Sequence, residues 1–295
     1  MKKLVSFVVV LLSVFVLVAC SGGKDLTVGT QTYSETKIMG YMYKELIEAE
    51  TDLNVDVKTD MATDTLVLES MMNDELEIAT TYTGTALASF FTIDNPRDAE
   101  ATMEQTQHDF LDEYNIKVYD SLGFANTYAL AVTEEMAEEH NLETISDLAD
   151  IADTLDFGSD TSWLERSGDD GYEAFTELYG FEFGETSPMS PNLVYEALES
   201  EERDVVLAYS TDARIDTMNL KTLEDDLQFF PPYEASSYVK QEILDEYPEL
   251  DEIFSKLEGE VDLDTIRELN RRVDIDGEEP HDVAIDFLEE RGLLE

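Results

Sequence analysis

Apolar and polar positions alternate with two different periods along most of the chain. Alternation with period two predicts strands, and apolar residues three or four positions apart predict helices. Strands are expected at residues 26–29, 53–58, 76–79, 117–120, 127–132 and 205–209. Helices are expected at 36–50, 65–72, from 85 onward, and at 144–152, 171–179, 192–198, 240–257, 263–273 and 280–293. Strands that alternate with helices in this way are typical of α/β layers.

These elements form two α/β halves followed by a helical C-terminal part. Pro231 and Pro232 interrupt the chain before that last part. Two α/β halves predict two lobes with a cleft between them. In open α/β sheets, ligands bind beyond the carboxyl ends of the strands, so we look for site residues there.

The composition excludes two classes of protein. The chain has 69 Asp and Glu against 18 Lys and Arg, a formal net charge of −51, yet 43% of its residues are hydrophobic. So many apolar residues exclude a wholly disordered acidic protein. A polyanionic surface repels nucleic acid, whose binding requires a basic footprint, so no nucleic-acid partner is expected.

The first 20 residues resemble a bacterial lipoprotein signal. Lys2 and Lys3 precede an apolar run at 4–19, and the segment ends Leu-Val-Ala-Cys at Cys20. The resemblance implies cleavage before Cys20 and attachment of diacylglycerol to its sulfur. The alternative is an ordinary signal peptide with an incidental Cys. Because Cys20 is the only Cys, disulfides and Cys-ligated metals are excluded, and the body is expected to be lipid-anchored on the extracellular face of the cell membrane.

Removal of the signal raises the negative charge further, to 16 − 69 = −53. Such a charge self-repels in dilute buffer. At about 1 M salt the Debye length falls to about 3 Å, which screens the repulsion. The charge therefore favours an exported protein adapted to high salt; the alternative is acidity unrelated to salt.

Tyr residues stand at four expected strand ends or edges. The candidate ligand-binding residues are Gln31, Tyr82, Thr85, Tyr128, Tyr209 and Tyr233. Four Tyr together would form an aromatic box, which suits a quaternary ammonium because that cation has no N–H to donate. The alternative for each Tyr alone is a packing residue at the surface.

Thr85 and Gln31 are candidates for the other end of the ligand. Thr85 lies where a helix begins, and exposed backbone N–H groups there favour an anion. The Thr85 hydroxyl and the Gln31 amide can both donate to a carboxylate, whereas an Asp at position 85 would repel one. The alternative for Thr85 is a simple helix N-cap.

Several segments together resemble one family, the substrate-binding lipoproteins of osmoprotectant ABC transporters for glycine betaine, carnitine and choline (Opu type). The matching segments are 28–33 (VGTQTY), 82–85 (YTGT), 119–130 (YDSLGFANTYAL), 161–164 (TSWL), 204–212 (DVVLAYSTD) and 229–233 (FFPPY). The resemblance covers essentially the whole chain and is specific only for the segments taken together.

The resemblance implies an α/β, two-lobed periplasmic-binding-protein fold (type II) with the ligand cleft between the lobes. The chain is then expected to cross twice, near 123–126 and 229–232. Lobe I would comprise 21–124 and 231–295, and lobe II 125–230.

The resemblance also assigns roles to the candidate residues. It implies an aromatic cage of Tyr82, Tyr128, Tyr209 and Tyr233, with carboxylate contacts from Gln31 and Thr85. Some relatives use an Arg from the second lobe, for which Arg166 is the nearby candidate, although a surface ion pair explains Arg166 as well.

Other chemistry has little support in the sequence. We find no Gly-rich phosphate loop and no HExxH or GxSxG motif, and His108, His140 and His281 lack metal-ligand spacing. We therefore expect no enzyme activity, cofactor or metal. The resemblance implies instead a receptor, expected to be monomeric, that delivers a quaternary ammonium solute to an ABC permease. The alternatives are a binding lipoprotein for an amino acid or for choline only, or an extracellular carboxylate-dependent hydrolase.

Overall fold

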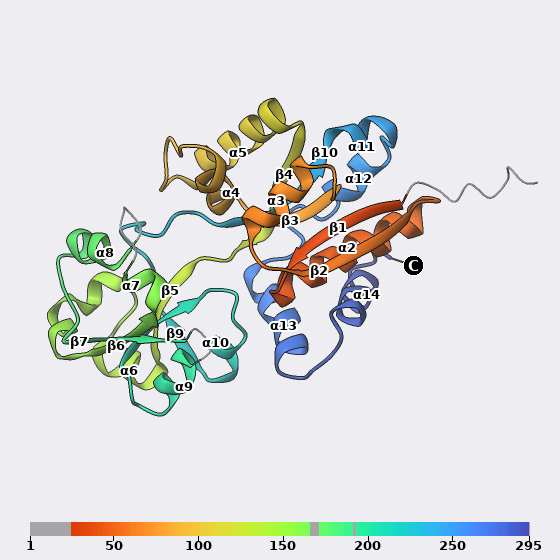
Figure 1. The fold of residues 1–295 in the computed structure, drawn as a ribbon. Coiled ribbons are helices and arrows are strands. Elements are labelled where there is room, and N and C mark those ends of the chain that lie inside the picture. The colour runs from red at the N-terminus through yellow and green to blue at the C-terminus, as the bar shows by residue number, and fades with distance from the viewer. Residues whose placement is uncertain (1–24, 166–170, 191–192, 295) are drawn as a thin grey trace, which may run out of the picture.

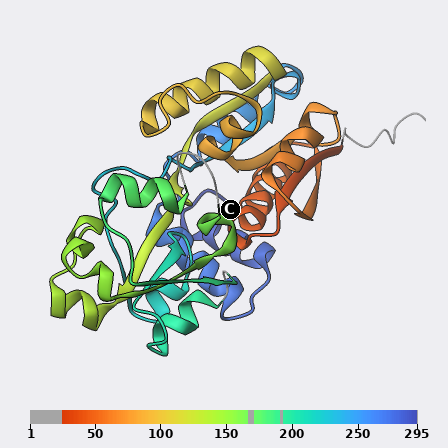
Figure 2. The ribbon, with the colours of Figure 1, turned by 60° about the vertical axis from the view of Figure 1, so that its left-hand side comes forward.

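The computed structural model describes residues 25–165, 171–190 and 193–294, which fold into two lobes (Figure 1). Each lobe is built on a five-stranded sheet with helices on its faces. Figure 2 shows the same lobes turned by 60°. The expected two-lobed α/β fold is confirmed.

The sheet of lobe I has the strand order β2-β1-β3-β10-β4. Its strands are β1 (Asp25–Gln31), β2 (Asn54–Met61), β3 (Ile78–Tyr82), β4 (Ile116–Ala125) and β10 (Glu234–Lys240). β1 runs parallel to β2 and β3, and β10 pairs antiparallel with both β3 and β4. The last strand of the lobe therefore lies between two strands that precede it by more than 100 residues in the sequence.

Helices cover both faces of this sheet. One face carries α2 (Ser34–Glu50), α11 (Gln241–Glu246), α12 (Leu250–Ser255), α13 (Leu263–Asp274) and α14 (Pro280–Glu290). The other carries α3 (Asp64–Met72), α4 (Thr83–Phe90) and α5 (Ala99–Tyr114). Neighbouring strand residues serve opposite faces: Ile78 packs in the first core and Ala79 in the second.

The sheet of lobe II has the order β7-β6-β8-β5-β9. Its strands are β5 (Tyr128–Thr133), β6 (Asp156–Asp160), β7 (Glu185–Met189), β8 (Val205–Tyr209) and β9 (Leu220–Thr222). Its helices are α6 (Glu134–His140), the 3₁₀ helices η1 (Ile145–Asp150) and η2 (Ala152–Thr154), α7 (Thr161–Leu164), α8 (Tyr172–Tyr179), α9 (Val194–Glu199) and α10 (Arg214–Thr217). One core is rich in aromatic rings, including the buried Phe157, Trp163 and Phe175.

The chain crosses between the lobes twice. It leaves the first sheet after Ala125, enters the second at Tyr128, and returns between Thr222 and Glu234. The two connections lie side by side, because the backbone N–H of Asn126 donates to the Tyr233 carbonyl at 3.1 Å. The crossing expected near 229–232 lies in the second connection, whereas the one expected near 123–126 overlaps the first connection only at Asn126, because β4 extends to Ala125.

Three expectations about individual elements are wrong. The helix expected at 240–257 is two helices, α11 and α12, because Pro248 disfavours helical geometry at Tyr247, which has φ −129° and ψ 76°. The helix expected at 144–152 is the shorter 3₁₀ helix η1. The strand expected at 76–79 begins at Ile78 and runs to Tyr82.

The sequence pattern also missed β10, together with β6, β7, β9, α5 and α6. β10 reads Glu-Ala-Ser-Ser-Tyr-Val-Lys, with no alternation of apolar and polar residues, because both of its faces are buried. Its buried Ser237 shares a hydrogen bond of 2.7 Å with the Tyr43 hydroxyl.

Within the described residues, none of the helices combines the length and the apolar character that a membrane span requires.

Candidate functional site

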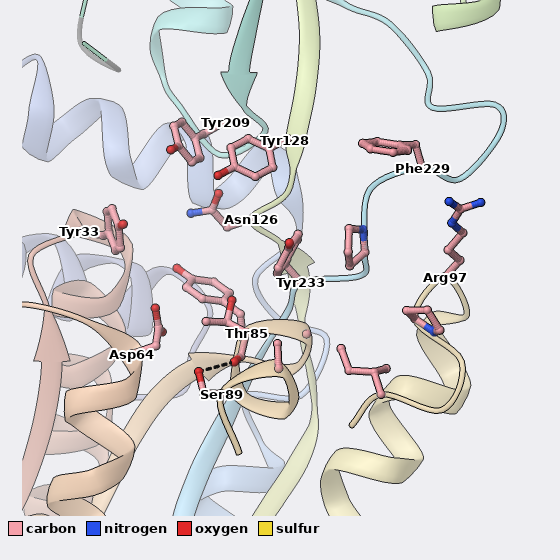
Figure 3. Close-up of a pocket in the computed structure, with 16 residues that line it drawn as sticks. Tyr33, Asp64, Thr85, Ser89, Arg97, Asn126, Tyr128, Tyr209, Phe229 and Tyr233 are labelled. Atoms are coloured by element: carbon pink, nitrogen blue, oxygen red, sulfur yellow. Dashed lines mark hydrogen bonds between the residues drawn. The ribbon is translucent and has the colours of Figure 1, made fainter. Parts of the chain in front are cut away.

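A cavity of about 520 Å³ opens between the two lobes (Figure 3). This volume is within the range of roughly 300–1,000 Å³ that is usual for small-molecule sites. The lining residues are Tyr33, Asp64, Tyr82, Gly84, Thr85, Ala88, Ser89, Ile93, Pro96, Arg97, Asn126, Tyr128, Tyr209, Phe229, Pro231 and Tyr233.

Parallel strands bring several polar residues to one edge of lobe I. Gln31 ends β1, Tyr82 ends β3, and Asp64 lies three residues beyond the end of β2. Since parallel strands present their carboxyl ends at the same edge, residues far apart in the sequence meet there. The structure therefore brings the lobe I candidates to one edge of the sheet.

Tyr128 and Tyr209 meet because they are direct partners in the antiparallel pair β5–β8. Their ring centroids are 5.2 Å apart at an interplanar angle of 41°. Behind Tyr128 lie Phe230, at 5.7 Å, and the fully buried Trp163, at 6.5 Å. These rings fix the lobe II wall of the cavity in place.

Tyr233 reaches the cavity because Gly84 lets the second connection approach α4 closely. A Cβ at position 84 would lie 2.5 Å from the Pro232 carbonyl oxygen and 3.3 Å from Cδ1 of Tyr233. Glycine is therefore required at position 84, because a larger residue would keep the backbone of α4 from approaching the second connection so closely.

Tyr82 is held by a buried carboxylate. Its hydroxyl donates to Oε1 of Glu35, and burial together with this carboxylate raises the pKa of Tyr82 well above its usual value. Glu35 also accepts from Asn126 Nδ2 at 2.6 Å and from Asn270 Nδ2 at 3.1 Å. Three donors thus replace the water that a buried carboxylate needs.

Thr85 lines the cavity one turn before Ser89 on α4. The Ser89 hydroxyl donates to the Thr85 carbonyl at 2.9 Å (Figure 3). Within the described residues, the Thr85 hydroxyl itself forms no hydrogen bond, so it is available to a ligand.

Gln31 occupies a different place from the one expected. Its side chain is 1% exposed and does not line the cavity. Its Nε2 donates to Oδ1 of Asp64 at 2.6 Å, and Thr81 donates to the same oxygen at 2.7 Å. In this structure Gln31 therefore contacts Asp64 and lies outside the cavity lining.

Sequence reasoning missed Asp64, Tyr33, Asn126 and Arg97 as lining residues. Tyr33 and Asn126 were within the matching segments, so their position was a usable signal. Asp64 was one of 69 acidic residues and could not be singled out. Arg97 was one of only 18 basic residues, a weak signal that the pattern did not use. Cys20 and Arg166 lie outside the described residues.

The cavity combines aromatic faces with one carboxylate, one guanidinium and two hydroxyls on α4. In the part of the chain that the structure describes, no group of three or more His, Cys, Asp or Glu could hold a metal ion. An arrangement of this kind suits capture of a small organic cation or zwitterion.

Comparison with known proteins identifies the family. Residues 24–290 match OpuAC, the substrate binding domain of ABC-type glycine betaine transport systems. The chain belongs to this family. The family resemblance seen in the sequence is thereby confirmed.

Relatives of this family cover nearly the whole chain. The carnitine transport binding protein OpuCC of Listeria monocytogenes is 38% identical over 304 residues, which cover 100% of this chain and 98% of the relative. The glycine-betaine-binding protein of Pseudomonas aeruginosa is 32% identical and covers 94% of each chain. A crystal structure of a glycine betaine/carnitine/choline ABC transporter superposes with a TM-score of 0.87 at 39% identity, covering 91% of this chain and 99% of that one. These relatives are transport proteins, so the expectation of a non-enzymatic protein is confirmed and the hydrolase alternative is set aside.

Proposed function

We propose that the protein captures glycine betaine and related quaternary ammonium solutes for an ABC importer. The observation that carries the proposal is the ring of aromatic side chains around the cavity between the lobes. Membership of the OpuAC family and the names of the Listeria and Pseudomonas relatives support the same ligand class.

The trimethylammonium group binds among Tyr82, Tyr128, Tyr209 and Tyr233. Each aromatic face contributes about 0.5–2 kcal/mol when desolvated. A micromolar affinity corresponds to about 8 kcal/mol, so the cage alone is marginal. Asp64, which lines the same cavity, adds the attraction of a carboxylate for the cation.

Thr85 supplies a hydroxyl to the polar part of the ligand. Gln31 acts indirectly, because its amide is engaged by Asp64.

The location in this proposal rests on the export signal, and the permease partner on membership of the OpuAC family. Residues 1–20 direct export, Cys20 carries the lipid, and the monomeric body stays at the extracellular face of the cell membrane. There the ligand-bound form is recognised by the permease. The charge of −51 supports a further part of the proposal, that the protein works for osmoprotection in a high-salt environment.

Substitutions of Tyr209 and Tyr233 test the cage. We expect Tyr209→Ala and Tyr233→Ala each to lower the affinity for glycine betaine by about tenfold or more, because each removes a cation–π face. Tyr209→Phe is the matched control, since it keeps the ring and should keep most of the affinity. Unchanged affinity in both Ala variants would contradict the cage.

Ligands that differ in the methylation of their ammonium group distinguish the proposed receptor from the remaining alternative, a receptor for an amino acid. Glycine, dimethylglycine and glycine betaine share a carboxylate but differ in their ammonium group. A cage of Tyr faces favours the fully methylated ammonium, whereas a primary amine needs acceptors for its N–H groups. Tighter binding of glycine than of glycine betaine would favour the amino-acid alternative.

A further inference from the structure

Glu35 is a buried carboxylate that lies outside the lining of the ligand cavity. Its side chain is 2% exposed and belongs to the first turn of α2, where the backbone favours a negative charge. The described side chains that donate to it, Tyr82, Asn126 and Asn270, are all neutral. Because burial of a carboxylate without a cation is costly, we look for a role of Glu35 in addition to stability.

The three donors to this carboxylate come from different parts of the molecule. Tyr82 ends β3 and lines the cavity, and its hydroxyl donates to Oε1 of Glu35. Asn126 lies in the first connection between the lobes, also lines the cavity (Figure 3), and donates to the same oxygen at 2.6 Å. Asn270 on α13 donates to Oε2 at 3.1 Å. One carboxylate therefore joins the cage, the connection and a helix.

Two of these donors extend the network to the rest of the cage. Asn270 also donates to the Thr211 carbonyl of lobe II at 3.0 Å, two residues after Tyr209. The backbone N–H of Asn126 donates to the carbonyl of Tyr233 at 3.1 Å. The carboxylate is thus linked to the backbone at or near two further Tyr of the cage.

A second cavity, of about 560 Å³, shows from which side Tyr82 is held. Glu35 and Asn270 line only this second cavity, Tyr82 lines only the ligand cavity, and Asn126 lines both. The carboxylate therefore holds the Tyr82 hydroxyl from outside the ligand cavity, while the residue itself borders the ligand.

We propose that Glu35 is a positioning residue of the cage, which fixes the ring of Tyr82 relative to the first connection and to lobe II. A ring held in this way is already ordered when the ammonium group arrives, so less free energy of binding is lost in ordering it. This inference rests on the proposed function, because the role of Glu35 is exerted through the same cage.

A double-mutant cycle of Glu35→Gln and Tyr82→Phe, titrated calorimetrically with glycine betaine at one fixed salt concentration, tests this role. Tyr82→Phe keeps the aromatic ring and removes only the hydroxyl that Glu35 holds. Each single substitution should lower the affinity by about fivefold or more, because a hydrogen bond to a charged group is lost or weakened. The double variant should bind about as tightly as the weaker single variant, since both substitutions interrupt one contact.

Two further variants are matched controls. Tyr209→Phe removes a cage hydroxyl that Glu35 does not contact, and should keep most of the affinity. Glu77→Gln removes a carboxylate of lobe I that accepts from the Thr27 backbone N–H at 2.7 Å, outside the lining of both cavities, and should leave the affinity unchanged. Thermal unfolding of every variant measures stability separately from binding.

Each outcome has a distinct meaning. An equal loss of affinity from Glu35→Gln with and without Tyr82→Phe would show that Glu35 acts independently of that hydroxyl, and would overturn the assignment. Unchanged affinity in Tyr82→Phe would overturn it even if Glu35→Gln does not fold. If the unsubstituted protein binds glycine betaine and the cycle shows no coupling, only this inference fails. If the unsubstituted protein binds none of glycine betaine, carnitine and choline, the proposed function fails, and this inference fails with it.

Discussion

Tyr82 and Tyr209 each present an aromatic ring to the cavity while their hydroxyl groups stay neutral. Burial raises the pKa of both, and Glu35 adds to this effect for Tyr82, whereas Tyr128 and Asp160 do so for Tyr209. A neutral phenol offers its ring face to a cation without contributing an anion of its own. The negative charge of the cavity lining therefore comes from Asp64.

The protonation of Asp64 should make binding depend on pH. Burial raises the pKa of this carboxyl against the hydrogen bonds from Thr81 and Gln31, which lower it. The ionised form attracts a cation and the protonated form does not, so we expect choline affinity to fall as the pH falls from about 7 toward the ordinary carboxyl range near 4. Choline has no carboxyl group of its own, so the titration reports the protein.

Asp64→Asn is the control for this prediction, since it keeps the shape of the side chain and removes the titration. The variant should bind choline more weakly at neutral pH, with an affinity that no longer changes with pH. The same pH dependence in both proteins would show that another group titrates.

Gly84 offers a second test at this scale. Gly84→Ala forces Pro232 and Tyr233 away from α4, because the added Cβ would lie 2.5 Å from a backbone oxygen. Overpacking of this kind costs about 1–3 kcal/mol. We expect a lower melting temperature and about a tenfold loss of glycine betaine affinity, measured by thermal unfolding and calorimetry.

Gly180→Ala is the control that separates the loss of stability from the loss of affinity. Gly180 has φ +74° and no heavy atom within 4 Å of its added Cβ, so the change strains the backbone at a residue outside the cavity lining. It should lower the stability and leave the affinity unchanged. If Gly84→Ala also leaves the affinity unchanged, the proposed role of Tyr233 is contradicted.

At the scale of elements, α13 of lobe I contacts lobe II directly. Asn270 Nδ2 donates to the Thr211 carbonyl at 3.0 Å, and Arg267 Nε donates to the Ser210 carbonyl at 2.6 Å. Asn270 also donates to Glu35, which holds Tyr82. One helix thus links the cage to the packing of the two lobes.

Asn270 is therefore expected to be important for stability. Asn270→Ala removes a donor from a buried carboxylate, which should cost about 1–3 kcal/mol of unfolding free energy. Asn270→Asp should cost more, because it places a second carboxylate against Glu35. Thermal unfolding at neutral pH measures the relative stability of the two variants. If Asn270→Asp were more stable than Asn270→Ala, this account of the hydrogen bonds around Glu35 would be contradicted.

The sequence pattern predicted strands well where the buried residues are apolar, and poorly where buried positions carry polar residues. β8 was predicted with its observed bounds, because Val205 to Tyr209 is a continuous apolar run. β10 was missed, since its two buried faces include Ser236 and Ser237.

The same contrast applies to the site. Four Tyr at strand ends could be predicted because strand ends converge. The position of Asp64 in the cavity lining and its hydrogen bond with Gln31 depend on how β1, β2 and β3 pack together, which no local sequence pattern encodes.

At the scale of the whole molecule, the dominant feature is the charge of −51. In dilute buffer this charge favours expansion, and salt at about 1 M reduces the Debye length to about 3 Å. We expect the melting temperature to rise steeply between about 0.1 M and 2 M NaCl. A melting temperature that does not change with salt would contradict adaptation to high salt.

The central claim is that the cavity captures a quaternary ammonium solute. Isothermal titration of the chain without residues 1–20, in about 2 M salt, with glycine betaine, carnitine, choline and glycine tests it most directly. The account predicts micromolar binding of at least one trimethylammonium zwitterion, one per chain, and much weaker binding of glycine. Absence of binding by all three trimethylammonium compounds, in protein shown to be folded, would contradict it.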